Sequence, residues 1–374
     1  MSEFVTKKIT DSAGTGAPSF TYGLNSGGSD SGLIGKAFTS SGTEPSSPAN
    51  GDLWYDSGND KLYYYVAGEF KQITHVNPST LWYGDRGIFA GGYNNSIPGK
   101  QNVIQYIDIT SSGNATDFGD LLASFYGAAG CSDATYGVIF AGNDEVQDRE
   151  EISYITISTT GNATDFGDLT TGMESGAAAA DSTRGLHFGG ERVDGTYYSN
   201  NIEYITIASP SNSTDFGDLS VSRRQLAALS NGTRGVTAGG QGASAYNNVM
   251  DYVVIQTTGN ATDFGDLLGS KKNMAGAGGD TRGLFGGGRN SSSILDQIEY
   301  ITTDTTGNST DFGDLVSGQH ILSAVNNATT AIFGGGTSSD SLQSVTIATT
   351  GNASDFGDLS AQTYAMASMS GAAS

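Results

Sequence analysis

The stretch that decides the fold is TTGNATDFGDL at residues 159–169, because close copies of it recur through most of the chain. The pentapeptide DFGDL occurs six times. The copies begin at Asp117, Asp165, Asp215, Asp263, Asp311 and Asp355, at spacings of 48, 50, 48, 48 and 44 residues. A nearly constant period of this size is the sequence signature of a repeat architecture.

Two further motifs recur in step with DFGDL. Arg-Gly-apolar-x-x-Gly-Gly begins at Arg86, Arg184, Arg234 and Arg282, with Tyr136 and Thr330 in the arginine position of the other two copies. A tyrosine motif, apolar-x-Tyr-Ile-x-Ile, centres on Tyr106, Tyr154, Tyr204, Tyr252 and Tyr300, with Ser344 in the sixth copy. The tyrosine position always precedes the DFGDL aspartate by 11 residues, and the next arginine position always follows it by 19. All variation in length therefore lies between Gly-Gly and the tyrosine, as expected of stacked copies of one rigid unit.

Each repeat predicts four strands. GVIFAG (137–142) is an apolar strand, and YITIST (154–159) alternates with the period of a strand. TGN is expected to be a hairpin turn, in which Gly and Asn tolerate positive φ. ATDFGDL is a short strand whose glycine predicts a bulge. The residues that follow, such as SGAAAADST (175–183), are small and suit a place where sheets converge near an axis.

In these motifs the chain resembles the kelch family. The family pattern is an apolar strand ending in Gly-Gly, then a tyrosine, then a tryptophan shortly before a leucine, and here phenylalanine stands in the tryptophan position of every copy. The resemblance covers residues 86–374 and implies an all-β, six-bladed, kelch-like β-propeller over residues 76–374. The first blade lacks one strand, which we expect from AQTYAMASMS (361–370) or, alternatively, from HVNPSTLWY (75–83).

The residues before the repeats differ in character. Residues 1–45 are rich in Ser, Gly and Thr and predict an extended attachment segment, while residues 46–75 predict a small β-meander of three strands. The pattern PANGDLWYD followed by KLYYY resembles a small module of bacteriophage tail and appendage proteins, and TGNATDFGDL is similar to repeats in virion proteins of phages of marine bacteria. The resemblance implies a virion structural protein, either a tail fibre or another surface appendage. It implies other virion proteins as partners of the N-terminal segment, and a host cell-surface glycan or protein as partner of the propeller.

Composition excludes several classes of partner. The net charge of −22 argues against nucleic acid, which needs a basic face. No apolar run approaches the length of a membrane span, so no membrane insertion is expected. No secretory signal precedes the repeats, so we expect synthesis in a host cytoplasm and a final location in the virion. The lone Cys131 forms no internal disulfide and is expected to be a buried small hydrophobe. A homo-oligomer remains a possible assembly.

No catalytic, cofactor or metal residues are predicted. DFG lacks the other kinase motifs, and its aspartates are expected to accept backbone N–H bonds, with Ca²⁺ binding left open as the alternative. His75, His187 and His320 share no ligand spacing, and a packed core position is expected for His187. The four motif arginines could mimic the arginine cluster of a sialidase, but one repeat position in four blades favours a repeated salt-bridge or stacking role.

The variable loops are the predicted binding elements, because equivalent loops should emerge on one face. They are residues 93–101, 143–151, 191–201, 241–248, 289–297 and 337–341. The candidate surface-binding residues are Tyr93, Asn94, Arg192, Tyr197, Tyr198, Tyr246, Asn247 and Arg289. Tyrosine with Asn and Ser is a contact set suited to sugar or protein. The function expected is therefore non-enzymatic binding; the alternatives are an intracellular kelch-type interaction scaffold and a sialidase-like glycan hydrolase.

Overall fold

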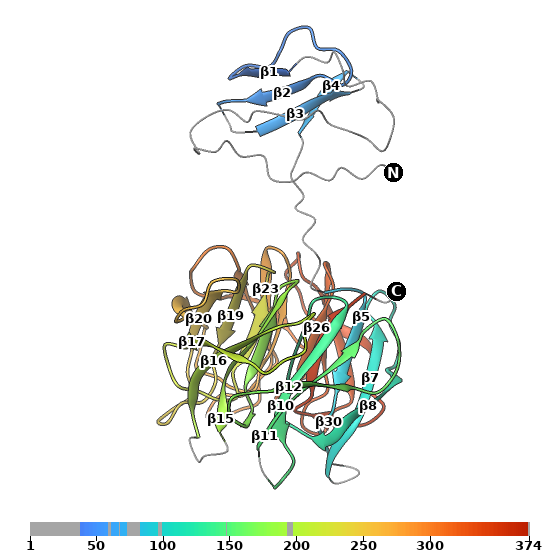
Figure 1. The fold of residues 1–374 in the computed structure, drawn as a ribbon, viewed down its shortest axis with the longest axis vertical. Coiled ribbons are helices and arrows are strands. Elements are labelled where there is room, and N and C mark those ends of the chain that lie inside the picture. Colours follow the sequence, from blue (N-terminus) through green and yellow to red (C-terminus); the bar gives the residue numbers. More distant parts are fainter. Residues whose placement is uncertain are drawn as a thin grey trace. The chain divides into compact units, whose positions relative to one another are not determined.

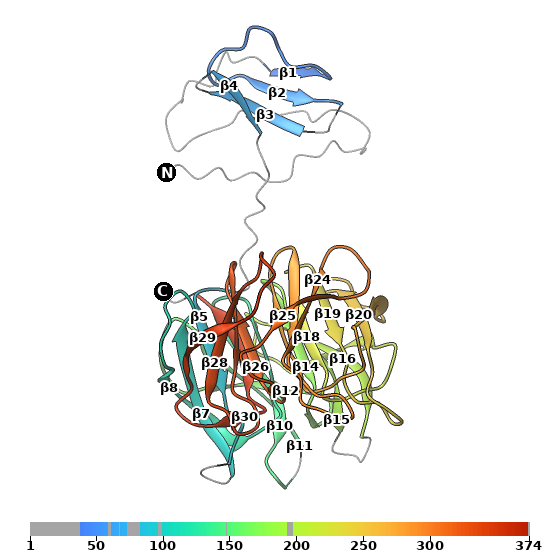
Figure 2. The same cartoon turned by 180° about the vertical axis from the view of Figure 1, so that it is seen from behind.

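The computed structural model describes residues 38–58, 61–66, 68–72, 83–95, 99–146, 148–192 and 197–372. Every regular element in these ranges is a β-strand (Figures 1 and 2). The chain divides into two compact units, Met1–Asn77 and Pro78–Ser374. In the described ranges no helix has the length and apolar character needed to cross a membrane.

The first unit contains one four-stranded sheet. Its strands are β1 (Phe38–Ser41), β2 (Leu53–Asp56), β3 (Lys61–Val66) and β4 (Glu69–Gln72), in that order across the sheet. The buried Trp54 stacks on Tyr63 with ring centroids 4.9 Å apart and meets Phe70 edge-on at 5.3 Å. The three predicted strands of the meander are present, and β1, which lies within the segment predicted to be extended, adds a fourth that pairs parallel to β2. Residues 1–37 of that segment lie outside the described ranges.

The second unit repeats one four-stranded antiparallel sheet. The sheets are β9 (Ala129–Ser132), β10 (Tyr136–Asn143), β11 (Asp148–Thr156) and β12 (Thr164–Asp168); β14 (Ala177–Ala180), β15 (Arg184–Arg192), β16 (Ser199–Thr206) and β17 (Thr214–Asp218); β18 (Ala227–Ser230), β19 (Arg234–Ala238), β20 (Val249–Val254) and β21 (Thr262–Asp266); β22 (Ala275–Gly278), β23 (Arg282–Gly286), β24 (Gln297–Thr302) and β25 (Thr310–Asp314); and β26 (Ser323–Asn326), β27 (Thr330–Gly334), β28 (Ser341–Thr346) and β29 (Ser354–Asp358). Each predicted strand of the repeat is therefore present.

A further sheet joins the two ends of this unit. It contains β5 (Arg86–Ala90), β7 (Gly99–Asp108), β8 (Thr116–Phe125) and β31 (Ala367–Gly371). β31 pairs antiparallel with β5, placing Met369 opposite Ile88, which is the pairing that the sequence predicts for residues 361–370. Most of the rival segment, residues 75–83, lies outside the described ranges. Three two-residue strands, β6 (Tyr93–Asn94), β13 (Met173–Glu174) and β30 (Thr363–Tyr364), extend the sheets at one end.

The repeated tyrosine holds two other repeated side chains. The phenylalanine of DFGDL packs edge-on against it, as in Tyr154–Phe166 at 5.8 Å between centroids. Where the motif arginine is present, its guanidinium lies over the tyrosine ring, as with Arg184 at 4.2 Å from the centroid of Tyr204. Arg184 also donates a 3.0 Å hydrogen bond to the carbonyl of Ile255 in the next sheet. The stacking role predicted for the arginines is confirmed.

The glycine of DFGDL lies where neighbouring sheets approach each other. A register shift marks a bulge at each DFGDL, as predicted, and Gly167 has a φ of 144°. A Cβ there would lie 2.5 Å from the backbone of Ser211 in the next sheet, so only glycine fits without a shift of the backbone.

The asparagine of TGN has a different role from the one predicted. None of the described TGN asparagines has a positive φ. Instead, each Oδ1 accepts the backbone N–H of the second DFGDL aspartate of the preceding repeat, at 3.0–3.1 Å. Asn114 accepts this bond from Asp358, so the series also links the first repeat to the last. The asparagine therefore contributes through its side chain and does not use the positive φ that it could tolerate.

The cores lie between successive sheets. One cluster combines Val236, Met250 and Phe264 of one sheet with Phe285 and Ile301 of the next. Since each sheet buries both faces against its neighbours, the second strand of each reads as a continuous apolar run. The architecture is all-β, with repeated four-stranded antiparallel sheets, and is consistent with a β-propeller.

Candidate binding face

Two kinds of connection meet at one end of the repeated sheets. One kind is the variable loops between the second and third strands, and the other is the segments that follow DFGDL. In Figure 1 these ends of β11 and β15 lie at the lower edge of the second unit, whereas the C-terminus lies at its upper edge. We call the end with the variable loops the loop face. The varied residues of the repeat are therefore concentrated at one end of a constant frame.

A ring of backbone hydrogen bonds lies on the loop face. It is formed by Gly127, Ser175, Gln225, Asn273, Ile321 and Ala365, which we call the collar. Each N–H donates to the carbonyl of the preceding member at 2.6–3.0 Å, and Gly127 donates to Ala365, so the six bonds form a closed ring. All six residues have φ between 55° and 72°, although only one is glycine. A left-handed conformation costs a non-glycine residue about 1–2 kcal/mol, and the hydrogen bonds offset part of that cost.

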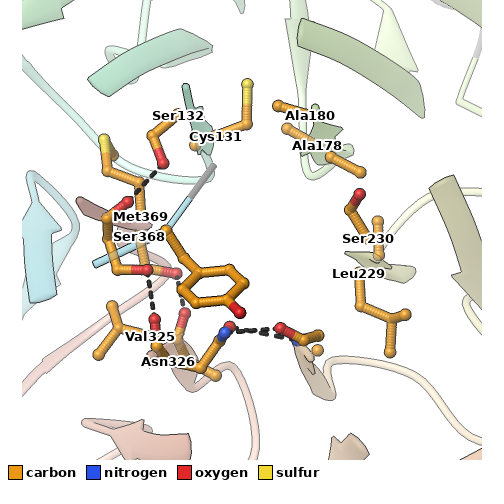
Figure 3. Close-up of a pocket in the computed structure, with 18 residues that line it drawn as sticks. Cys131, Ser132, Ala178, Ala180, Leu229, Ser230, Val325, Asn326, Ser368 and Met369 are labelled. Atoms are coloured by element: carbon orange, nitrogen blue, oxygen red, sulfur yellow. Dashed lines mark hydrogen bonds between the residues drawn. The ribbon is translucent and has the colours of Figure 1, made fainter. Parts of the chain in front are cut away.

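The pocket between the innermost strands is lined by small side chains (Figure 3). Its walls come from β9, β14, β18, β22, β26 and β31, as expected for small residues where sheets converge. Polar groups here bond to neighbouring strands: Ser132 donates to the carbonyl of Ser370 at 2.6 Å, and Asn326 donates to that of Gly278 at 2.6 Å. Burial raises the pKa of the Cys131 thiol, which therefore stays protonated and is a poor nucleophile, in line with the predicted buried role.

Tyr83 also lines this pocket. Its side chain is 3% exposed, and its hydroxyl donates a 3.0 Å hydrogen bond to Asp280 Oδ1. Burial, with the neighbouring Asp280, raises the pKa of the Tyr83 hydroxyl, so the phenol stays neutral. The pocket therefore holds packed and hydrogen-bonded groups rather than a reactive one.

Two columns of the repeat surround the collar on the loop face. The residue before each collar position is Tyr126, Glu174, Arg224, Lys272, His320 or Tyr364. The residue after each Gly-Gly, or Ala-Gly in one copy, is Tyr93, Asn143, Glu191, Gln241, Arg289 or Thr337. Backbone bonds hold the columns together: Lys272 and Arg289 exchange N–H···O bonds of 3.1 and 2.9 Å. Sheet pairing thus places these side chains next to one another although they are far apart in sequence.

Four of these residues form a basic cluster: Arg224, Lys272, Arg289 and His320. Burial and then the charges of Arg224 and Arg289 lower the pKa of Lys272. Burial and then the charges of Arg289 and Lys272 lower the pKa of His320. The like charges are therefore close enough to repel one another, in a chain whose acidic residues outnumber its basic ones 39 to 17.

Tyrosines lie beside the basic cluster. Tyr93 packs against Tyr126 and Tyr364, with centroids 5.6 and 5.5 Å away. The Tyr198 ring lies 5.6 Å from the guanidinium of Arg224, and the Tyr246 ring lies 4.8 Å from Lys272 Nζ. Aromatic faces beside cations suit a ligand with both an apolar face and a negative charge.

The structure brings three of the eight predicted site residues to this cluster, Tyr198, Tyr246 and Arg289. A fourth, Tyr93, packs against Tyr126 and Tyr364. Tyr197 is 61% exposed and Asn94 only 2%. Arg192 donates to Thr171 Oγ1 at 3.3 Å. The backbone N–H of Asn247 donates to the carbonyl of Gly240 at 2.8 Å.

Sequence reasoning missed Arg224, Lys272, His320, Tyr126 and Tyr364. The predicted binding elements were the loops whose length varies between repeats, whereas these residues lie in a segment whose length is the same in every repeat. The available signal was the column itself, since the residue nine positions after the first aspartate of each DFGDL varies from Tyr to Glu to Arg within an otherwise uniform frame. A column that varies inside a constant repeat is a candidate contact position.

In the part of the chain that the structure describes, the side chains that could bind a metal ion or a substrate carboxylate do not gather at one place. In the described part of the chain, no three His, Cys, Asp or Glu side chains gather to hold a metal ion. His187 is 2% exposed, as predicted for a packed position, and burial lowers its pKa to about 4 although Glu203 opposes the shift. The motif arginines each hold their own tyrosine and the next sheet, so they do not converge on a shared carboxylate.

Comparisons with known proteins add no identification. No protein-family model matches the chain, and the search of curated proteins found no match.

Proposed function

We propose that residues 78–374 form a closed, six-bladed, kelch-like β-propeller. Supporting this are the six repeats, the pairing of β31 with β5, and the bond from Asp358 to Asn114. The collar adds six hydrogen bonds whose order returns to the first member. Each of these links joins the last repeat to the first, as a closed ring of blades requires.

We propose that this propeller is the non-enzymatic binding module of a phage virion protein, such as a tail fibre or other surface appendage. The N-terminal segment would attach to other virion proteins, and the loop face would contact a host-surface glycan or protein. The observation that carries the proposal is the concentration of varied polar and aromatic side chains on the loop face of a uniform frame. Repeated positions elsewhere serve packing, whereas these positions differ from copy to copy and are free to serve recognition.

The test is binding of the fluorescently labelled full-length protein to a panel of bacterial cells. The comparison is a variant in which the six variable loops are cut to the length of the shortest. We expect binding to at least one host, with loss on trimming while thermal unfolding stays cooperative. Equal binding by the trimmed protein would contradict a role for the loop face. Failure to bind any host would contradict the host-surface role.

A further inference from the structure

The basic cluster on the loop face contains a cation without a counter-charge. Within the described ranges, Arg289 makes no ion pair, and its Nε is buried without a hydrogen-bond partner. His320 Nδ1 is likewise buried and without a hydrogen-bond partner there. An unsatisfied buried donor is costly, so such groups in a native structure call for a ligand or an ion to complete them.

Neighbouring basic residues show the contrast. Arg223 is fully buried and bonds Asp251 at 2.9 Å, and Lys271 is paired with the buried Glu299. The Nε atoms of Arg223 and Arg224 also lack a hydrogen-bond partner, but both of these arginines have a carboxylate partner, Arg224 in Glu191. What distinguishes Arg289 is therefore the missing counter-charge, because it makes no ion pair among the described residues.

Only one member of the basic cluster makes an ion pair in the described part of the chain. Arg224 is paired with Glu191, while Lys272 Nζ donates to the neutral amide oxygen of Gln241 at 2.6 Å. Glu174 lies one place before Arg224 in the column around the collar, and Lys272 and His320 follow Arg224 in that order. Within the described ranges Lys272, His320 and Arg289 have no ion-pair partner.

The same order places tyrosines next to the uncompensated side. His320 is followed by Tyr364 and then by Tyr126, and Tyr93 packs on both of these. A pyranose ring stacks on aromatic faces, and a carboxylate or sulfate accepts charge-assisted hydrogen bonds from arginine and lysine. A flexible acidic peptide needs no such adjoining aromatic arc.

We propose that Arg289, Lys272 and His320 bind the carboxylate or sulfate of an acidic saccharide whose ring packs against Tyr364 and Tyr93. This inference rests on the proposed function and names the ligand class of the same face. Binding should weaken with added salt, because both partners are charged.

The experiment is titration calorimetry of the full-length protein with trigalacturonate, with the neutral sugar galactotriose as comparison. The variant is Arg289→Gln, which removes the uncompensated charge. The matched control is Lys71→Gln in the first unit, because Lys71 is already paired with Glu69 at 3.2 Å and lies in none of the variable loops. We expect R289Q to weaken trigalacturonate binding by about tenfold or more and K71Q to leave it unchanged. Thermal unfolding of R289Q should match or exceed the wild type, because a repulsive charge is removed.

Further ligands distinguish a carboxylated saccharide from a sulfated saccharide and from an acidic peptide. A sulfated galactose oligosaccharide that binds more tightly than trigalacturonate, and loses binding in R289Q, would support the site and name sulfate as its anion. Equal binding of poly-glutamate would overturn the saccharide assignment in favour of an acidic peptide. Wild-type protein that binds none of the acidic saccharides better than galactotriose would overturn the proposal, as would equal losses in R289Q and K71Q.

The cell assay distinguishes the two proposals. If host cells bind wild type and R289Q equally and trigalacturonate does not bind better than galactotriose, the host-surface role stands and the anion site is wrong. If trigalacturonate binds through Arg289 but no cell does, the anion site stands and the host-surface role fails.

Discussion

Single side chains in this protein join one repeat to the next. Each TGN asparagine uses its Oδ1 to hold a backbone N–H of the preceding repeat, and each motif arginine uses its guanidinium to hold a carbonyl of the following one. These bonds satisfy groups at the ends of strands that the sheets themselves leave unpaired. One favourable contact repeated around the molecule adds to stability several times over.

His187 makes stability depend on pH. It occupies the strand position held by Phe89, Phe285 and Phe333 in other repeats. Burial lowers its pKa to about 4, below the value of about 6.5 expected in the unfolded chain. The unfolded state therefore takes up a proton first as pH falls, so the stabilising contribution is complete above about pH 6.5 and is lost toward pH 4.

We expect His187→Phe to remove this dependence, which amounts to as much as about 3 kcal/mol in wild type between pH 7 and 4. The measurement is urea unfolding of both proteins at several pH values across that window. Carboxylates also titrate there, so the quantity that matters is the difference between the two curves. If the free energy of unfolding depends on pH in the same way in both proteins, His187 is not buried as a neutral group.

Elements in this fold end and bend where neighbouring sheets approach. The bulge at each DFGDL turns the outer strand, and its glycine lets the TGN turn of the next repeat come within contact of the backbone. The same short stretch therefore sets the bend of one strand and the spacing of two sheets. This dual role explains why DFGDL varies so little among the six copies.

Two glycines six residues apart, Gly161 and Gly167, should respond differently to substitution by alanine. At Gly167 the φ of 144° is unfavourable for alanine, and the added Cβ would meet Ser211 at 2.5 Å. At Gly161 a Cβ meets nothing within 4 Å. We expect Gly167→Ala to lower the free energy of unfolding by about 1–3 kcal/mol, and Gly161→Ala to change it by less than about 1 kcal/mol. Chemical denaturation of both variants measures this, and equal effects would contradict the close approach.

At the scale of the whole molecule, contacts between the first and last repeats matter most. β31 covers the edge of β5, Asp358 bonds Asn114, and Ala365 completes the collar with Gly127. The loop face owes its columns of side chains to this arrangement, because the same position of every repeat is brought around one axis. We therefore expect the proposed binding at that face to depend on these contacts between the first and last repeats.

Removing residues 361–374 tests this dependence. The deletion takes away β31, part of the collar and Tyr364, and leaves β5 as an uncovered sheet edge. Exposed strand edges promote pairing with other chains. We expect loss of cooperative unfolding and formation of large oligomers, measured by calorimetry and size-exclusion chromatography. A truncated protein that stays monomeric with wild-type stability would contradict the role of the C-terminal strand.

The sequence by itself determined the repeat, the four strands of each copy and the bulge in DFGDL. These features follow from residue spacing and hydrophobic periodicity, which can be recognised within the sequence of a single repeat. The sequence offered residues 361–370 or 75–83 for the last strand, and a salt-bridge or stacking role for the arginines, and the structure pairs β31 with β5 and stacks each arginine on a tyrosine. Only the tertiary structure decided the collar, the use of the TGN asparagines and the basic cluster. Arg224, Lys272, Arg289 and His320 are separated by up to 96 residues, and no local pattern relates them. They meet because successive sheets place equivalent positions side by side, which is a consequence of how the repeats pack rather than of any one repeat.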